Sequence, residues 1–261
     1  AHRARAVDRS GAPRLQVRGL TTDATRGASP LRGVDFDLWP GEVLGIAGVD
    51  GNGQKHLAEV LAGQRAAASG SISLGGTDVT GDAVPERRRR GGGYVTGERV
   101  GEGTVGIFSV ATNLVLKEIG TPPFFRRGIS DWDHIHAHAK ALIKRNDIRT
   151  PSEKTQVAKL CGGNNQKVLL GRELNGEASV VIFNKPTYGL DLQNTRLAHE
   201  RILAGAEQGL ATVVISTDLD ELLEISDRMG VMFQGHLAGI VENGPDVERK
   251  VGLLMTGAKA A

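Results

Sequence analysis

The feature that most constrains this chain is a glycine-rich loop between a short apolar run and a helical pattern. Residues 43–47 are mostly apolar, residues 48–56 read Gly-Val-Asp-Gly-Asn-Gly-Gln-Lys-His, and an amphipathic pattern begins at Leu57. A strand, a glycine-rich turn and a helix start in this order form a phosphate-binding loop, because backbone N–H groups and the helix dipole converge on an anion. The alternative interpretation is a tight strand-to-helix turn with no ligand.

Two side chains of this loop depart from the phosphate-loop pattern G-x-x-x-x-G-K-[ST]. Gln54 stands where the lysine is expected, and Lys55 stands where the Ser or Thr is expected. Gln54 can donate a hydrogen bond to phosphate but carries no charge, and Lys55 would repel Mg²⁺. The sequence therefore predicts a cradle that depends on backbone groups. The residues predicted to bind the phosphates are Gly48, Asp50, Gly51, Asn52, Gly53, Gln54 and Lys55.

Composition limits the class of protein. The 261 residues are enough for one large α/β domain or two small ones, and 39 % of them are hydrophobic. A formal net charge of +2 argues against a dedicated nucleic-acid-binding protein. Cys161 is the single cysteine, so a reducing compartment is expected. No apolar run approaches the roughly 18–20 residues that span a bilayer. Residues 1–13 are expected to be a linker or lead-in, and residues 258–261 a tail.

Short alternating and apolar segments predict an α/β fold. Residues 15–20 and 31–38 alternate between apolar and polar side chains, and the first of them is expected to be an edge strand. Together with residues 70–76 they predict an antiparallel β layer. Residues 180–183 and 212–216 are almost entirely apolar, as in the buried strands of a parallel sheet with flanking helices. Ligands of such sheets bind at the carboxyl ends of the strands, where the glycine-rich loop lies.

A helical subdomain is predicted at about residues 105–175. Residues 109–160 are expected to be mostly helical. The best-defined helix follows Asp131, which can cap its start. The apolar residues of this helix share one face: Ile135, Ala139, Leu142 and Ile143.

Two other patterns have both a structural and a functional interpretation. Residues 87–90 are four consecutive arginines at the end of a short predicted helix. Such a run is usually a solvated face, and contact with nucleic acid is the alternative. His134 and His138 lie one helical turn apart and could bind zinc. Because no third ligand is visible in the sequence, no metal site is predicted.

A second glycine site occurs later in the chain. Residues 160–167 read Leu-Cys-Gly-Gly-Asn-Asn-Gln-Lys and precede a helical pattern at 168–174. Paired glycines at a helix start form an anion site, because N–H groups and the helix dipole point at the same place. The alternative is a helix cap after a loop. The glycine-rich loop earlier in the chain favours the functional interpretation.

Several segments, in this order, resemble the motifs of ABC ATPases. The loop at 45–54 is similar to that of the carboxyl-terminal ATPase half of sugar and nucleoside importers, and residues 160–167 resemble the LSGGQ-type signature. Residues 186–191 match the family's Pro-Thr-x-Gly-Leu-Asp D-loop, and residues 215–228 resemble its switch segment. The resemblance covers about residues 14–257 and implies a P-loop ABC-type ATPase core with an antiparallel β layer and a helical subdomain. It adds the ATP-contacting residues Cys161, Gly162, Gly163, Asn164, Gln166 and Asp191.

The resemblance also identifies departures at the catalytic positions. In the family, the strand at 180–183 ends in an aspartate that holds the metal and a glutamate that polarises the attacking water, but here Asn184 and Lys185 follow. Thr217 replaces the switch histidine, and Cys161 replaces the signature serine. No residue is therefore assigned as catalytic. Because phosphoryl transfer depends on positioning and charge neutralisation, this chain's own loop is predicted not to hydrolyse ATP at a useful rate and to have little affinity for Mg²⁺.

Phosphate affinity is still expected at this loop. The backbone cradle remains, and Lys55 or Lys185 could supply positive charge in place of Mg²⁺. A compensating arrangement, in which Lys55 turns into the position of the missing lysine, is opposed by helix geometry, because adjacent side chains point about 100° apart.

The resemblance implies the carboxyl-terminal ATP-binding half of an ABC importer for sugars or nucleosides. In that family two ATPase halves face each other head to tail, and each ATP lies between one P-loop and the opposite signature. The implied partners are the second half, permease subunits that dock near the helical subdomain and residues 98–103, and indirectly a solute-binding protein. The implied location is cytoplasmic, at the inner face of the cell membrane. The alternatives are a non-hydrolysing pseudo-ATPase that regulates its partners and a soluble ABC-type ATPase of DNA repair or translation.

Overall fold

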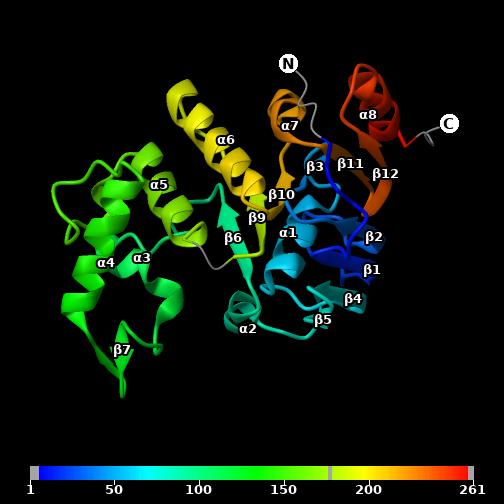
Figure 1. Ribbon diagram of the computed structural model, residues 1–261. Coiled ribbons are helices and arrows are strands. Elements are labelled where there is room, and N and C mark those ends of the chain that lie inside the picture. The colour runs from blue at the N-terminus through cyan, green and yellow to red at the C-terminus, as the bar shows by residue number, and fades with distance from the viewer. Residues whose placement is uncertain (1–5, 176–177, 258–261) are drawn as a thin grey trace. The chain divides into compact units, whose positions relative to one another are not determined.

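The computed structural model describes residues 6–175 and 178–257 of the chain. These residues form two compact units, and each is considered by itself. Unit 1 contains residues 6–94, 178–186 and 199–257, and unit 2 contains residues 95–175 and 187–198. Figure 1 labels most of the helices and strands.

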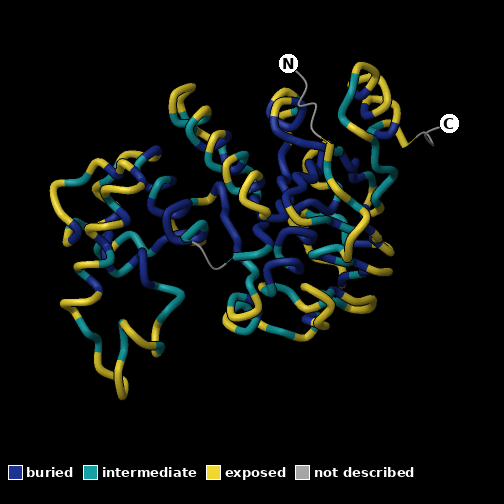
Figure 2. The backbone as a smooth tube through the Cα atoms, viewed as in Figure 1, coloured by how far each residue is buried: buried dark blue, intermediate teal, exposed yellow. Residues whose placement is uncertain are grey.

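The largest sheet has six strands in the order β12-β11-β3-β10-β9-β6. Strands β11, β3, β10 and β9 run parallel, and β12 is antiparallel to β11. Strands β3 and β10 are buried along their whole length, as Figure 2 shows in dark blue, which explains why their sequences do not alternate. The bounds are β3 Val43–Ala47, β6 Gly92–Thr96, β9 Val180–Asn184, β10 Ala211–Ile215, β11 Arg228–Phe233 and β12 His236–Glu242.

A second sheet of unit 1 is antiparallel, with the strand order β2-β1-β4-β5. The expectation that residues 15–20 form an edge strand is wrong, because β1 lies between β2 and β4. Alternation reports one buried face, here carried by Leu15, Val17 and Leu20, and does not show whether the strand is paired on both sides. The bounds are β1 Leu15–Thr21, β2 Arg32–Leu38, β4 Ser69–Leu74 and β5 Thr77–Asp78.

Helix α1 fixes the glycine-rich loop to the interior of unit 1. Its side chains Leu57 and Leu61 share one hydrophobic cluster with Leu44 and Ile46 of β3. The loop is therefore held between a buried strand and a packed helix. The helices of unit 1 are α1 Gln54–Ala62, α2 Val84–Arg89, α7 Leu219–Ile225 and α8 Val247–Met255, and α6 Leu192–Glu207 begins in unit 2 and ends in unit 1.

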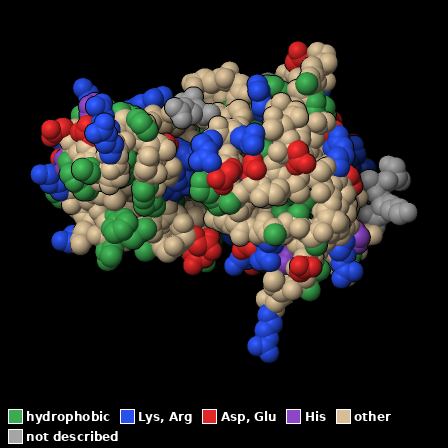
Figure 3. Space-filling model, turned by 90° about the horizontal axis from the view of Figure 1, so that it is seen from below, with side chains coloured by type: hydrophobic (Ala, Val, Ile, Leu, Met, Phe, Trp, Pro, Cys, Tyr) green, Lys and Arg blue, Asp and Glu red, His purple; other side chains and the backbone are tan. Residues whose placement is uncertain are grey.

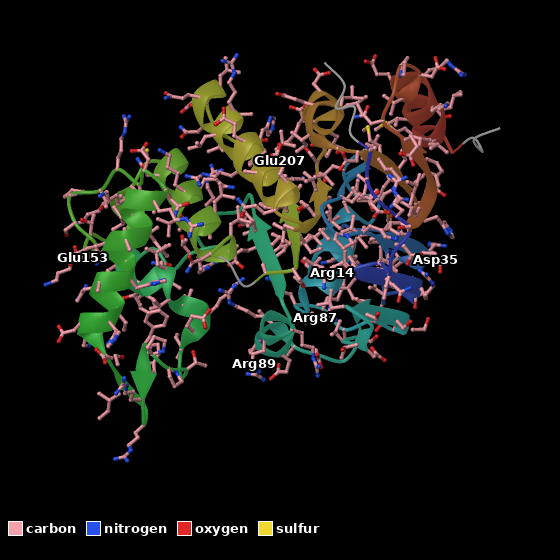
Figure 4. The ribbon with its side chains drawn as sticks, viewed as in Figure 1. Arg14, Asp35, Arg87, Arg89, Glu153 and Glu207 are labelled. Atoms are coloured by element: carbon pink, nitrogen blue, oxygen red, sulfur yellow. The ribbon has the colours of Figure 1, made fainter. Side chains whose placement is uncertain are left out.

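Arg87 corrects the expectation that the arginine run is a solvated face. Its side chain is buried, with 2 % of the residue exposed. Its guanidinium donates to the carbonyl oxygens of Val60 at 2.6 Å and Leu61 at 2.7 Å, near the end of α1, and to that of Val79 at 2.9 Å. The last carbonyl groups of a helix have no partner within the helix, so a buried donor stabilises them. Figure 4 labels Arg87 and the exposed Arg89 of the same helix.

Unit 2 is built around three helices. Side chains of α3, α4 and α5 form its core, for example Val110, Ile135 and Val168. The bounds are α3 Val110–Leu114, η1 Leu116–Glu118, β7 Phe125–Arg126, β8 Ile129–Ser130, α4 Trp132–Arg145, η2 Val157–Lys159 and α5 Gly162–Glu173.

The expectation that residues 109–160 are mostly helical is wrong. The β7–β8 hairpin separates η1 from α4, because Pro122, Pro123 and Gly128 cannot continue a helix. The helix predicted after Asp131 is confirmed as α4, and the Asp131 carboxylate caps it. The buried residues of α4 are Ile135, Ala139 and Leu142.

His134 and His138 of α4 have other contacts. The Nδ1 atom of His134 lies 2.9 Å from the carboxylate of Asp131, and the ring of His138 packs against Phe124 with 4.8 Å between the ring centres. Within residues 6–175 and 178–257, no three His, Cys, Asp or Glu side chains form a group that could hold a metal ion.

The surface carries charges of both signs. On the face drawn in Figure 3, Lys and Arg side chains lie among Asp and Glu side chains, in keeping with the net charge of +2. None of the described helices is long and apolar enough to cross a membrane.

Candidate functional site

Three neighbouring parallel strands of unit 1 end at one edge of the six-stranded sheet. The glycine-rich loop follows β3, Thr217 lies just after β10, and Lys185 directly follows β9. The register pairs Ile215 of β10 with both Ile46 of β3 and Asn184 of β9, so the three strand ends are level. The structure therefore brings the loop to one edge together with Asn184, Lys185 and Thr217, which occupy the positions that the resemblance marks as catalytic and that are substituted here.

The shape of the loop requires its glycines. Gly48, Gly51 and Gly53 have φ angles of 149°, 88° and 108°, in the region that side chains other than glycine rarely adopt. A Cβ atom on Gly48 would also lie 2.6 Å from Nε2 of Gln54 and 2.7 Å from the carbonyl oxygen of Met232. The loop therefore curves tightly against β11 and its own helix start.

Asn52 fixes the loop from within. Its side-chain amide donates to the carbonyl oxygen of Val49 at 2.9 Å, and its Oδ1 atom accepts from the N–H of Gln234 at 2.7 Å. The N–H of Gly235 donates to the Asn52 carbonyl oxygen at 2.9 Å. These bonds join the loop to the turn between β11 and β12, so its conformation is set before any ligand binds.

The backbone of the loop presents a row of donors. The first helical bond at this end runs from the Leu57 N–H to the Gly53 carbonyl oxygen at 2.9 Å. Among the residues that the structure describes, the N–H groups of residues 51–56 have no acceptor. Convergent N–H groups at a helix start bind anions, and phosphate is the typical ligand. The geometry fits a phosphate cradle.

The two unusual side chains of the loop point in different directions. Gln54 is buried at 3 % exposure, and its Nε2 atom donates to the Val49 carbonyl oxygen at 2.9 Å. Its Oε1 atom has no hydrogen-bond partner among the described residues. Lys55 is exposed, and its Nζ atom lies 3.8 Å from the carboxylate of Glu59, one turn along the helix. This placement opposes the idea that Lys55 occupies the position of the missing lysine.

Lys185 reaches the loop from β9. Its Nζ atom lies 3.0 Å from Oδ1 of Asp50, in a salt bridge between residues far apart in the sequence. Its own backbone adopts a left-handed φ of 51°, and its N–H donates to the Ile215 carbonyl oxygen at 2.7 Å. The neighbouring Asn184 donates instead to the hydroxyl of Tyr94 at 3.3 Å. A cation thus stands at the strand end, beside the loop.

The segment after β10 is held by a buried network. Thr217 is exposed, but the Ser216 hydroxyl donates to Glu221 at 2.6 Å, and Nε2 of His199 lies 3.2 Å from the same carboxylate. Burial alone would lower the pKa of His199, but the hydrogen bond and charge of Glu221, together with Glu224, raise it overall. Thr217 cannot accept a proton in the way a histidine does. It directly follows Ser216, a member of this network.

In unit 2, the second glycine site begins α5. Cys161 precedes the first helical residue and is exposed. Hydrogen bonding from the Asn164 N–H lowers the pKa of the Cys161 thiol, and the Asn164 amide lies 3.1 Å from its sulfur. Gly162 is also exposed, whereas Gln166 is buried at 2 % exposure. The accessible part of this segment is therefore its first turn.

Gly163 brings the glycine site against the start of α6 within unit 2. A Cβ atom on Gly163 would lie 2.3 Å from Nδ2 of Asn194. Asn194 in turn donates to Asp191 twice, from its backbone at 2.9 Å and its side chain at 2.7 Å. The backbone N–H of Asn194 is the main cause that lowers the pKa of Asp191. Asp191 therefore caps α6, and only a glycine allows this packing.

Arg99 lies between the second glycine site and the segment that precedes α6. Its Nη1 atom donates to the carbonyl oxygen of Tyr188 at 2.5 Å. Its Nη2 atom would lie 3.4 Å from a Cβ atom built on either Gly162 or Gly189. A guanidinium thus borders the exposed glycine site and places a positive charge where an anion would approach.

A family model described as "ABC transporter" matches residues 31–188, which include the glycine-rich loop, the second glycine site and the end of β9. The chain belongs to the ABC transporter family.

Known proteins of similar sequence are larger than this ABC chain. It is 34 % identical over 243 residues to "Nucleoside import ATP-binding protein NupA" from Lactococcus lactis, covering 93 % of the chain and 48 % of that protein. It is 36 % identical over 251 residues to "Glucose import ATP-binding protein TsgD13" from Haloferax volcanii, covering 95 % of the chain and 45 % of that protein. The chain spans about half the length of these relatives.

The fold of this ABC chain is also found in solved structures. A nucleotide-free ATP-binding cassette from an ABC transporter superposes with a TM-score of 0.76 at 20 % sequence identity, covering 91 % of this chain and 94 % of that one. The predicted α/β class with a mainly parallel sheet and added antiparallel strands is confirmed.

The loop of this ABC chain fits phosphate but does not fit a divalent metal. Magnesium requires oxygen ligands, preferably carboxylates and water. Asp50 is the carboxylate of the loop and is already paired with Lys185, while Lys55 and Asn184 supply no anionic oxygen. The donors that remain are N–H groups and an ammonium, which bind anions.

The sequence analysis missed Asn194 and His199, and it placed Arg99 within residues 98–103 without showing its contact. Asn194 follows Asp191 at the spacing of a helix cap, which is a readable signal. Arg99 precedes a glycine-rich turn, but nothing local shows that it reaches Tyr188. His199 occupies an ordinary helical position, and no sequence signal links it to Glu221.

Proposed function

We propose that this chain is the carboxyl-terminal ATP-binding half of an importer for nucleosides or sugars, and that its own loop binds ATP without hydrolysing it. ATP is hydrolysed at a second ABC half, to which this chain contributes residues 160–166. The two halves associate head to tail, at the inner face of the cell membrane. Permease subunits and a solute-binding protein complete the importer. These partners are part of the proposal.

The relatives support the choice of transport class. Both are described as import ATP-binding proteins, one for nucleosides and one for glucose. Because the chain spans about half of each, a double-length protein with one active and one altered half is consistent with the match.

The observation that carries the proposal is the salt bridge between Lys185 and Asp50. A catalytic strand end must hold a metal and activate water, and both tasks need oxygen ligands or a base. Lys185 is a cation that can do neither, and Asn184 is a neutral amide bound to Tyr94. Removal of one such group typically lowers the rate about 10²–10³-fold.

The second glycine site supports a role in the partner's reaction. Cys161 and Gly162 are exposed at the start of a twelve-residue helix, α5, with the N–H groups and dipole that favour an anion. Arg99 adds positive charge beside them. This surface retains anion-binding chemistry, although the loop of unit 1 lacks catalytic groups.

The test is ATP hydrolysis by the chain together with its cognate amino-terminal half. Gly162→Asp introduces a negative charge at the exposed glycine site and should lower the rate of the pair at least about 10²-fold. The matched control is Gly81→Asp, because Gly81 is exposed and a Cβ atom there meets nothing within 4 Å. This control should retain the rate of the unmodified pair.

The outcomes separate the candidate functions. The isolated chain should show no turnover, and the pair should hydrolyse ATP. Full activity of the Gly162→Asp pair would contradict the shared site. A pair without any ATPase activity would favour the other candidate, a non-hydrolysing module that regulates its partners, which the loss of the catalytic residues also supports.

A further inference from the structure

The charges around the glycine-rich loop are arranged in the reverse of the pattern expected for a metal-dependent site. In the family pattern the loop carries a lysine and the strand end carries carboxylates. Here the loop carries the carboxylate of Asp50, the strand end carries the ammonium of Lys185, and the two lie 3.0 Å apart. Gln54, at the position of the loop lysine, is neutral and buried.

Lys185 is held in place by its backbone. It directly follows β9, adopts a left-handed φ of 51°, and donates its N–H to the carbonyl oxygen of Ile215 at 2.7 Å. An L-residue adopts this conformation only where the surrounding structure imposes it. About a third of the Lys185 side chain is exposed, at 34 %, so the ammonium can also meet a ligand from solvent.

The loop offers the same ligand a second kind of contact. The N–H groups of residues 51–56 have no acceptor among the described residues, and α1 is long enough, at nine residues, to contribute a helix dipole. Gln54 is buried, and its Nε2 atom already donates to the Val49 carbonyl oxygen, so its side chain contributes no charge to the loop. The N–H groups are therefore the polar groups of the loop that an anionic ligand would satisfy.

Lys55 does not place its ammonium against the loop as Lys185 does. Its side chain is 63 % exposed and lies toward Glu59 on α1. Asp50 is 74 % exposed at its side chain, so its pairing with Lys185 can exchange for another anion without unfolding the loop. Lys185 is thus the ammonium that the structure places against the loop.

We infer that Lys185 is the built-in counter-cation of this loop, and that the loop binds nucleoside triphosphate as the metal-free anion in preference to its Mg²⁺ complex. The inference rests on the proposed nucleotide-binding role of the loop. A phosphate group replaces the carboxylate of Asp50 as the partner of Lys185. Mg²⁺ competes with this ammonium for the same phosphate oxygens, so added Mg²⁺ weakens binding.

The experiment is isothermal titration calorimetry of the chain with ATP, in EDTA and in excess MgCl₂. The unmodified chain should bind ATP more tightly in EDTA than in MgCl₂. Lys185→Ala should weaken binding in EDTA about tenfold or more, because it removes the charge that neutralises the phosphates. Lys250→Ala, which removes one positive charge at an exposed position of unit 1, is the matched control and should leave the Kd unchanged.

A second variant keeps the test decisive if Lys185→Ala fails to fold, which circular dichroism would show. Asp50→Asn frees Lys185 from its present partner and should tighten ATP binding in EDTA several-fold. Lys55→Ala tests the rival lysine. A tenfold loss on Lys55→Ala combined with none on Lys185→Ala would overturn the inference.

The failures of the inference and of the proposed function are distinguishable. Binding that stays unchanged or tightens when Mg²⁺ is added would refute the inference and leave the nucleotide site intact. Absence of ATP binding under both conditions would refute the inference and the nucleotide role of the loop. Even then, the contribution of residues 160–166 to a partner is tested separately by Gly162→Asp.

Discussion

The strongest stability prediction concerns Arg87, because a buried guanidinium joins α2 to the end of α1. Arg87→Met keeps most of the apolar stem and removes the charged group. The carbonyl oxygens of Val60 and Val79 each keep one backbone donor, the N–H groups of Gly63 at 3.2 Å and Asp82 at 3.0 Å. The carbonyl oxygen of Leu61, bound at 2.7 Å, loses its donor.

These contacts set the expected magnitude. An orphaned buried carbonyl costs about 1–3 kcal/mol, and bonds to a charged donor contribute about 1.5–3 kcal/mol each before the desolvation of the guanidinium is subtracted. Burial indeed lowers the pKa of Arg87, with the charges of Asp82 and Asp78 opposing this effect. The net loss on Arg87→Met should be about 2–4 kcal/mol in the free energy of unfolding of unit 1.

The assay is urea unfolding followed by tryptophan fluorescence. The chain has two tryptophans, Trp39 in unit 1 and Trp132 in unit 2, so a Trp132→Phe background reports on unit 1 alone. The control is Arg89→Met on the same helix, where the arginine is exposed and its surface salt bridge contributes about 0–1 kcal/mol. The reasoning would be refuted if Arg87→Met lowered stability by no more than the Arg89 control.

Two further predictions follow from the described contacts. The pKa of His199 is raised above its unfolded value near 6.5, so its protonated form stabilises unit 1 fully below that pH, and this stability is lost as the pH rises through the folded pKa. The difference in unfolding free energy between the unmodified chain and His199→Gln should therefore shrink as the pH rises above about 6.5, and a difference that stays constant with pH would contradict it. Gly163→Ala should displace Asn194 and lower the stability of unit 2 by about 1–3 kcal/mol, and Asn194→Ala should recover part of this loss; two purely additive effects would exclude the contact.

The sequence predicted the elements that local patterns define. The apolar strands β3, β9 and β10, the loop that follows β3, and the capped helix α4 all follow from apolar runs, glycines and a capping aspartate. The errors have a common cause. The pairing of β1 on both sides and the burial of Arg87 depend on neighbours that are remote in the sequence, and no local pattern reports them.

In the candidate site, too, the sequence predicted local features but did not predict contacts between remote residues. The glycines and the unusual side chains of the loop can be read directly, because each occupies a fixed position in a known pattern. Their contacts cannot be read. The salt bridge of Lys185 with Asp50 joins positions 135 residues apart, and Lys55 and Lys185 were equally good sources of charge until the structure placed one of them at 3.8 Å from Glu59 and the other at 3.0 Å from the loop.

The unusual residues at this site are therefore easier to explain as a set than singly. Replacement of a loop lysine by Gln54 removes one positive charge from the cradle, and Lys185 returns one positive charge from the strand end. The positive charge presented to phosphate is then similar, whereas Asn184 and Lys185 supply neither the carboxylate nor the base that the resemblance leads us to expect at these positions. Carboxylates restored at positions 184 and 185 alone would face Asp50 without a cation between them, and like charges at such distances repel. Phosphate affinity without hydrolysis is accordingly what we propose for this loop.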